Sequence, residues 1–248
     1  METEDLTSHI SNRFNADLKR LNNQFLMMGG QVEQQLKDAV AAIVDMNLDR
    51  ADSVISNEKL INEQEIFLDN ECIEVLALRQ PAAGDLRMVV AIFRSIADLE
   101  RIGDESKKIA KLALQIADQN VGARGCIETR HISGQVVTMM RNALDAFARF
   151  DVDMALSVLQ DDKKVDVEYK ATMRQLVTYM MEDPRSISRA LNVIWALRAM
   201  ERIGDHAHNI AENLIYLVKG KDVRHAPLDS VKDTLAQLQQ ESEESGEK

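Results

Sequence analysis

A five-residue motif that occurs twice constrains the fold of this chain more than any other feature. The sequence Glu-Arg-Ile-Gly-Asp spans Glu100–Asp104 and again Glu201–Asp205, so the two copies begin 101 residues apart. The residue before each copy is also apolar in both cases, Leu99 and Met200. A repeat at a fixed period predicts two copies of one structural unit.

The rest of the chain repeats at nearly the same offset. Gly134–Val136 repeats Gly30–Val32 at an offset of 104, and Pro184 follows Pro81 by 103. Each half contains three stretches with helical apolar periodicity and only short breaks. We therefore expect an all-α fold of two tandem three-helix bundles with long antiparallel helices. The expected domains are residues 10–118, residues 126–220, and a short helix with an acidic, disordered tail over residues 221–248.

Local signals predict where the helices begin and end. In the first half we expect helices over residues 14–44, 50–79 and 85–118, with residues 1–11 frayed. Asp85 is the expected N-cap of the third helix, and Ser186 is its counterpart in the second half. The glycine-containing stretch 119–125 is the expected linker, and the pair at 29–30 is expected to bend the first helix.

Composition and charge exclude several classes of protein. The formal net charge is −11 and the pI is about 5.0, which argues against nucleic acid and anionic lipid surfaces as direct partners. Arginines interrupt the longest apolar runs, so no membrane-spanning segment is expected. Two cysteines, Cys72 and Cys126, without a CxxC pattern, are typical of reduced thiols in a cytosolic protein.

Acidic side chains are expected to gather at one level in each half. The third helix carries two acids four residues apart, and the second helix carries two further polar residues four apart, so each pair shares a helix face. The nearer member of each pair lies 17 to 19 residues from the proline turn that joins the helices, which places the pairs at equal heights in an antiparallel hairpin. These positions are Glu58, Asn62, Glu100 and Asp104 in the first half and Asp162, Asp166, Glu201 and Asp205 in the second half.

Such a group of carboxylates needs a counter-charge. Salt bridges across the hairpin are one source, and the available cations are Arg101, Arg202, Lys59 and Lys163. A bound cation is the other source, and oxygen ligands suit Mg²⁺, Mn²⁺ or iron. The glycine inside each motif costs about 1 kcal/mol against alanine, which is understandable if another backbone, or an ion with its ligands, must approach there.

A histidine extends the second acidic group. His208 follows Asp205 by three residues and so lies on the same face, where it is a further candidate ligand. His206, next to Asp205, is an equally ranked candidate, although it points to another side of the helix than His208 does. The first half has Lys107 at the position of His208, which excludes a symmetric pair of sites.

The chain closely resembles the PhoU family over about residues 10–220. The resemblance is carried by the doubled pentad, by Gln80-Pro81 followed by Asp85-Leu86-Arg87, and by the two three-helix repeats. It implies an all-helical protein, often a homodimer, and in some members metal clusters bound through the Glu-x-x-x-Asp motif. Asn62 stands where the family pattern usually has Asp, which removes one negative charge from the first site.

The resemblance also implies a function without catalysis. Proteins of this family repress phosphate-starvation signalling in the cytoplasm by linking the ATPase subunit of the phosphate ABC importer to a sensor histidine kinase, and they limit phosphate uptake. They meet the membrane only through those partners. Two alternatives stay open, a carboxylate-bridged metal store or metalloenzyme and a helical scaffold whose acids are salt-bridged. No catalytic residue grouping is recognisable, so an enzyme is not expected.

A basic stripe is the other candidate partner site. Arg87, Arg94 and Arg101 lie seven residues apart along the third helix. They would either face an acidic partner or form ordinary solvated ion pairs.

Overall fold

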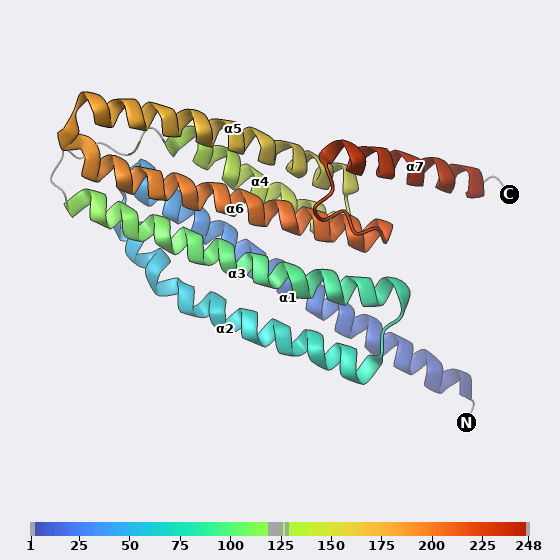
Figure 1. The fold of residues 1–248 in the computed structure, drawn as a ribbon. Coiled ribbons are helices and arrows are strands. Elements are labelled where there is room, and N and C mark those ends of the chain that lie inside the picture. Colours follow the sequence, from blue (N-terminus) through green and yellow to red (C-terminus); the bar gives the residue numbers. More distant parts are fainter. Residues whose placement is uncertain (1–2, 119–125, 127–128, 247–248) are drawn as a thin grey trace.

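Long α-helices make up nearly all of the described chain (Figure 1). The computed structural model describes residues 3–118, 126 and 129–246, and within these it contains no strand. The helices are α1 Thr3–Val44, α2 Leu48–Arg79, α3 Ala83–Asp118, α4 Arg130–Arg149, α5 Val152–Glu182, α6 Ile187–Lys219 and α7 Leu228–Gly246, with a 3₁₀ turn at Pro184–Ser186 before α6. None of these helices combines the length and apolar character needed to cross a membrane.

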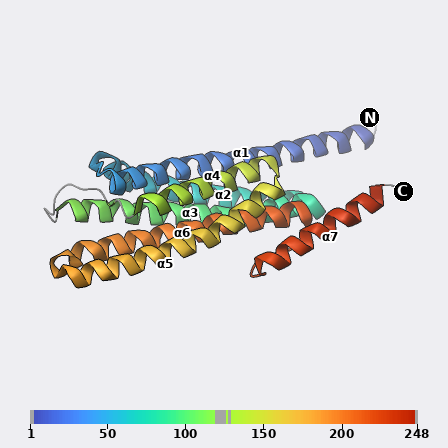
Figure 2. The same cartoon turned by 90° about the horizontal axis from the view of Figure 1, so that it is seen from above.

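The helices form two three-helix bundles side by side. α1, α2 and α3 pack together as one bundle, and α4, α5 and α6 pack as the other (Figures 1 and 2). α3 and α6 run antiparallel through the middle of the molecule, and each also contacts both other helices of its own bundle. This arrangement confirms the expected all-α fold of two tandem three-helix units.

A single hydrophobic core runs through both bundles. Phe25 of α1 and Phe147 of α4 lie in it with their ring centroids 4.7 Å apart, and Ile96 of α3 and Ile203 of α6 are fully buried. Burial of this kind stabilises the fold by roughly 25 cal/mol per Å² of apolar surface. The seam between α3 and α6 is therefore a rigid frame for the polar side chains along its edges.

The first turn of each half is built in the same way. Met46 and Phe150, 104 residues apart, end α1 and α4 in the left-handed conformation with φ of 54° and 55°. The next residues, Asn47 and Asp151, cap α2 and α5 by accepting a backbone N–H three residues on, at 3.3 and 2.9 Å. Residues 104 positions apart in the sequence therefore also form the same turn.

Several expected boundaries were wrong. α1 begins at Thr3 rather than near residue 14. As expected, the glycine pair at 29–30 does not end it. α3 begins at Ala83, so Asp85 lies in its first turn and is not its N-cap. Ser186 does occupy the N-cap position of α6, as expected, although its side chain makes no capping hydrogen bond. Asp183 caps the 3₁₀ turn that precedes α6. The expected linker 119–125 lies outside the described residues.

The end of the chain also differs from expectation. α7 extends to Gly246, although the sequence predicted a short helix over residues 229–238 and disorder over residues 241–248. Glutamate, glutamine and lysine have good helix propensity, so a polar sequence without apolar residues can still continue a helix. α7 extends away from the two bundles and contacts α5 (Figure 2).

Candidate cation and ligand sites beside α6

The four acids expected in the second half face one another across α5 and α6. A Cβ added to Gly204 would lie 3.5 Å from Oδ1 of Asp162, an ordinary contact distance, so Asp162 of α5 faces the motif glycine. Burial and then the charges of Asp162 and Asp166 raise the pKa of Asp205. Burial and then the charge of Asp205 raise the pKa of Glu201. The structure therefore brings the acids together, and the negative charges around Glu201 and Asp205 disfavour the ionisation of these two.

One oxygen of this group has no hydrogen-bond partner. Glu201 accepts a hydrogen bond from Nη1 of Arg198 at 2.7 Å through Oε1, while its Oε2 is buried and unpartnered. Asp166, on the outer side, is 3.7 Å from Nζ of Lys170. A buried carboxylate oxygen without a donor is costly unless a cation or a water supplies the missing contact.

His208 is held by carboxylates on two helices. Its Nδ1 lies 3.0 Å from Oδ2 of Asp162 on α5, and its Nε2 lies 3.4 Å from Oε1 of Glu212 on α6. Burial alone lowers the pKa of His208, but the hydrogen bonds to the two acids outweigh burial and raise the pKa to about 9. A protonated imidazole donates from both nitrogens, so in this arrangement His208 is a cationic partner of the two acids. Its predicted role as a metal ligand would require the ring to lose that proton.

The two histidines of α6 point to opposite neighbours. His206 contacts Asp98 of α3, with its Nδ1 2.9 Å from Oδ1, whereas His208 contacts α5. The helical wheel separated them, as expected, but the acidic partner of His206 lies in the other bundle and could not be identified from local spacing.

In the first half a lysine supplies the positive charge. Nζ of Lys107 on α3 lies 2.5 Å from Oε2 of Glu58 on α2, and Asn62 donates to Oε1 of Glu58 at 3.3 Å. The hydrogen bond from Lys107 is the largest cause of the lowered pKa of Glu58. Lys107 corresponds to His208 in the repeat, so both halves place a cation from the third helix against the second helix.

The remaining acids of the first half gather around a residue that sequence reasoning missed. Glu100 lies 3.4 Å from Nε of Arg101, and Asp104 lies 4.0 Å from Nη1 of the same arginine. Burial raises the pKa of Glu100, and Asp104 and Glu65 raise it further. Glu65 lies seven residues after Glu58 on α2, and this helical spacing could have identified it.

Of the cations offered as salt-bridge partners, Arg202 and Lys59 pair elsewhere. Arg202 reaches Glu105 of α3, with Nη1 2.6 Å from Oε1, and Lys59 lies 3.5 Å from Glu63 on the surface of α2. Arg101 contacts the motif acids Glu100 and Asp104, but these lie on its own helix, so these three cations do not form the expected salt bridges to the motif acids across the hairpin.

The oxygen atoms of this group are the kind of ligand that a hard cation prefers, but the side chains do not point to a common centre. Carboxylates with an unpartnered buried oxygen suit Mg²⁺, Mn²⁺ or iron. Within the described residues, however, no three His, Cys, Asp or Glu side chains are arranged so that they could hold a metal ion. The second-half acids would have to turn toward a common point, whereas the first half already contains the ammonium group of Lys107.

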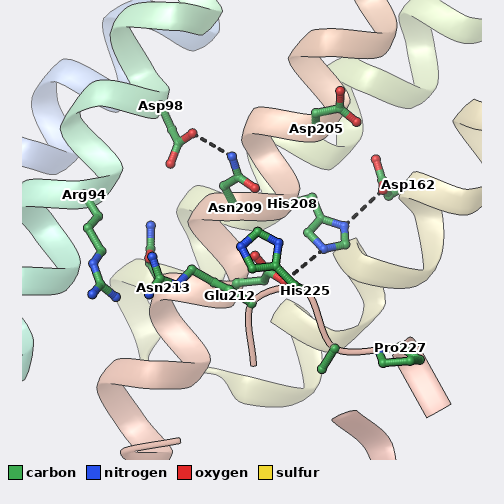
Figure 3. A pocket seen from close by; sticks show the side chains of 12 residues that line it. Arg94, Asp98, Asp162, Asp205, His208, Asn209, Glu212, Asn213, His225 and Pro227 are labelled. Atoms are coloured by element: carbon green, nitrogen blue, oxygen red, sulfur yellow. Dashed lines mark hydrogen bonds and ion pairs between the residues drawn. The ribbon is translucent and has the colours of Figure 1, made fainter. Parts of the chain in front are cut away.

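A polar pocket adjoins the second acidic group (Figure 3). It has a volume of about 650 Å³ and lies between α3, α5, α6 and the segment that follows α6. Asn209 of α6 donates to Oδ1 of Asp98 at 2.9 Å across it. Its lining residues are Arg94, Asp98, Asp162, Asp205, His208, Asn209, Glu212, Asn213, Arg224, His225, Ala226 and Pro227. His225, which was not among the candidate residues of the sequence analysis, is part of this lining.

The predicted basic stripe of α3 is engaged within the chain. Nε of Arg87 donates to the carbonyl of Leu217 at 3.3 Å. The guanidinium of Arg94 lies over the ring of Tyr216, 5.3 Å from its centroid, and 3.8 Å from Asp222. Together with the contacts of Arg101, these interactions favour the ion-pair interpretation of the stripe.

The profile of the PhoU domain family matches residues 25–113 and 129–214, one match in each half. The chain is 55% identical over 230 residues to the "Phosphate-specific transport system accessory protein PhoU homolog" of Pseudomonas aeruginosa, covering 93% of this chain and 95% of that protein. It is 43% identical to the Escherichia coli protein "Phosphate-specific transport system accessory protein PhoU", covering 95% of this chain and 98% of that protein.

Solved structures show the same likeness. The crystal structure of PhoU from Pseudomonas aeruginosa matches with a TM-score of 0.81 at 56% identity, covering 84% of this chain and 100% of that chain. The phosphate transport system regulatory protein PhoU from Streptococcus pneumoniae matches with a TM-score of 0.78 at 29% identity, covering 85% of this chain and 99% of that chain.

Proposed function

This chain belongs to the PhoU family, and we propose that it serves a phosphate-specific transport system as a regulatory accessory protein without catalysing a reaction. The observation that carries the proposal is the identity of 43–55% to accessory proteins of that system, over more than nine-tenths of this chain. The alignments also cover 95% and 98% of these two relatives, so the similarity extends over the entire relative and is not limited to one shared module.

The finer proposal is an adaptor. In the cytoplasm the chain would bind the ATPase subunit of the phosphate ABC importer and the sensor histidine kinase, and thereby repress phosphate-starvation signalling and limit uptake while phosphate is plentiful. It would act as a homodimer and reach the membrane only through these partners. The rigid seam between α3 and α6 supports this role, because a shared core holds the surfaces of both bundles in one geometry.

Complementation tests the proposal directly. The chain is expressed in an Escherichia coli strain that lacks its own relative of 43% identity, with a reporter driven by a phosphate-starvation promoter. We expect the reporter to be repressed in phosphate-rich medium, and purified chain to retain the kinase and the ATPase subunit in a pull-down. A reporter that stays fully active, together with retention of neither partner, would contradict the proposal.

A second candidate function, cation binding, is favoured by the unpartnered Oε2 of Glu201. Glu201, Asp205, Asp162 and Asp166 would hold Mg²⁺, Mn²⁺ or iron, whose charge would offset the repulsion that raises two of their pKa values. The first half would bind none, because among the described residues none of its grouped acids has a buried oxygen without a hydrogen-bond partner. The protein would therefore bind metal at the second half alone, as a structural or regulatory site, or as a metal store.

Titration of metal-free protein with Mn²⁺ tests this second proposal. Binding should be lost in the double variant Glu201→Ala, Asp205→Ala and unchanged in the matched first-half variant Glu100→Ala, Asp104→Ala, with helix content by circular dichroism unaltered in both. Equal losses in the two variants would show that the asymmetry between the halves is wrong.

A further inference from the structure

A groove at the other end of the α3–α6 seam repeats the position of the polar pocket with different chemistry. It has a volume of about 570 Å³, and in the described part of the chain only α3 and α6 line it. Its principal residues are Lys108, Lys111, Leu112, Trp195, Arg198 and Arg202. We refer to it as the basic groove.

The repeat relates the two cavities residue by residue. An offset of 101 takes Lys108 to Asn209 and Lys111 to Glu212, and the reverse offset takes Trp195 to Arg94. Residues at all of these positions line one cavity or the other. Equivalent positions of the two repeats therefore line a pocket of mixed charge at one end of the seam and a groove with cationic and aromatic side chains at the other end.

The charge of the groove is opposite to that of the whole protein. Four cations line it, and Glu105 is the one acidic residue among its lining residues. Glu105 is buried and lies between two of the cations, 2.8 Å from Nζ of Lys108 and 2.6 Å from Nη1 of Arg202. The formal net charge of the chain is −11, so the positive lining of the groove contrasts with an acidic protein.

An exposed apolar stripe leads into the groove along α6. Ile187, Leu191 and Trp195 follow one another at intervals of four residues, and they are 42%, 45% and 62% exposed. Side chains at this spacing share one face of a helix. Trp195 is the single tryptophan of the chain, and exposed tryptophan beside arginine is typical of residues that dominate binding energy at interfaces.

We propose that the basic groove binds an acidic segment of a partner protein, whose carboxylates meet the lysines and arginines while a bulky apolar side chain packs on Trp195. The inference rests on the proposed function as a partner-binding adaptor, and it assigns one partner surface and the chemistry it recognises. Arg198 and Arg202 keep their ion pairs with Glu201 and Glu105 while their remaining donors face the groove. An anionic membrane is disfavoured, because the groove is concave and the net charge of −11 repels an anionic surface at longer range.

Peptide selection on the full-length protein tests the proposal. Short random peptides are selected on the wild-type chain, and binders that survive on the variant Lys111→Glu are removed. We expect the remaining peptides to be rich in Asp and Glu around an aromatic or aliphatic residue. A synthetic copy should shift the fluorescence of Trp195 with saturation, and bind Lys111→Glu about tenfold more weakly because a like charge now opposes it. The control Lys232→Glu, an exposed position on α7, should bind as the wild type does.

Three results would overturn the proposal. Selected peptides could lack an acidic excess, or they could bind the Lys111→Glu variant as well as the wild type. Vesicles of phosphatidylglycerol and phosphatidylcholine could shift Trp195 fluorescence where the peptides do not, which would assign the groove to a membrane.

In the pull-down, capture of the kinase or ATPase by both the wild type and Lys111→Glu would refute the groove and leave the proposed function intact. Capture by neither would refute the function, while the peptide assay still judges the groove.

Discussion

Nδ1 of His208 lies 3.0 Å from Oδ2 of Asp162, and this contact joins α6 to α5 beside the second pair of motif acids. The other ring nitrogen lies 3.4 Å from Oε1 of Glu212, so the imidazole has an acid on each side. These two acids outweigh the effect of burial and raise the pKa of the ring to about 9. The bound proton is therefore part of the packing between the two helices.

Stability should consequently fall as the pH rises from neutral to alkaline. The pKa of His208 in the folded state is about 9, above the ordinary value of 6.5, so its contribution is complete below about pH 6.5 and lost above about pH 9. We expect a loss of about 2 kcal/mol across that window. Urea denaturation at several pH values should show a flatter profile for His208→Gln. The exposed control His131→Gln should keep the wild-type slope, and equal slopes in all three proteins would contradict the assignment.

Lys107 should matter for stability more than an exposed lysine on the neighbouring helix does. Its ammonium group lies 2.5 Å from Oε2 of Glu58, and both side chains are mostly buried, at 24% and 19% exposure. Lys107→Met would leave Glu58 among other acids without its counter-charge, at a cost of about 1–2 kcal/mol. Lys59→Met removes an ion pair at 3.5 Å from a lysine that is 83% exposed, and should cost less than about 0.5 kcal/mol. Similar losses in the two variants would show that the buried pair has no special role.

Repetition in the sequence was sufficient to predict the architecture. Because the offset between the halves is almost constant, a helix and turn pattern recognised in one half carries over to the other, and the left-handed residues Met46 and Phe150 follow it too. The equal heights of the acids on the second and third helices followed from their equal distances to the proline turn. Such predictions succeed because they depend on geometry within one hairpin.

Contacts between the halves could not be predicted in this way. The partner of His206 is Asp98 of the other bundle, 108 residues away, and no local periodicity relates them. The motif glycines were expected to admit a backbone or an ion, but Gly103 faces the side chain of Ile61 and Gly204 faces that of Asp162. Side chains of the adjoining helix, set by tertiary packing, determine these contacts. The continuation of α7 to Gly246 was not predicted, because a segment without apolar residues gives no periodic signal even when its glutamate and glutamine residues favour a helix.

Asp205→Asn should change stability in opposite directions with and without bound metal. Partial burial and the neighbouring acids raise the pKa of Asp205, so its ionised form is disfavoured in the folded state. With a chelator the neutral variant should therefore be slightly more stable, by less than about 1 kcal/mol because much of the residue still contacts solvent. With excess Mn²⁺ the wild type should gain stability by ligand binding, and the variant should gain less. Thermal unfolding under the two conditions measures both effects. A variant that is less stable in chelator and equally stabilised by Mn²⁺ would show that Asp205 neither repels its neighbours nor binds the metal.

The neighbouring glycines of α1 should respond oppositely to alanine. A Cβ at Gly30 would meet nothing within 4 Å, so Gly30→Ala should stabilise the helix by about 1 kcal/mol through propensity alone. A Cβ at Gly29 would lie 2.5 Å from Cδ2 of Leu144, which is buried at the contact between α1 and α4. Displacing that leucine costs about 1–3 kcal/mol, which exceeds the propensity gain. We therefore expect Gly29→Ala to lower the denaturation midpoint and Gly30→Ala to raise it. Equal stabilisation of both variants would mean that the two bundles do not pack closely at this point.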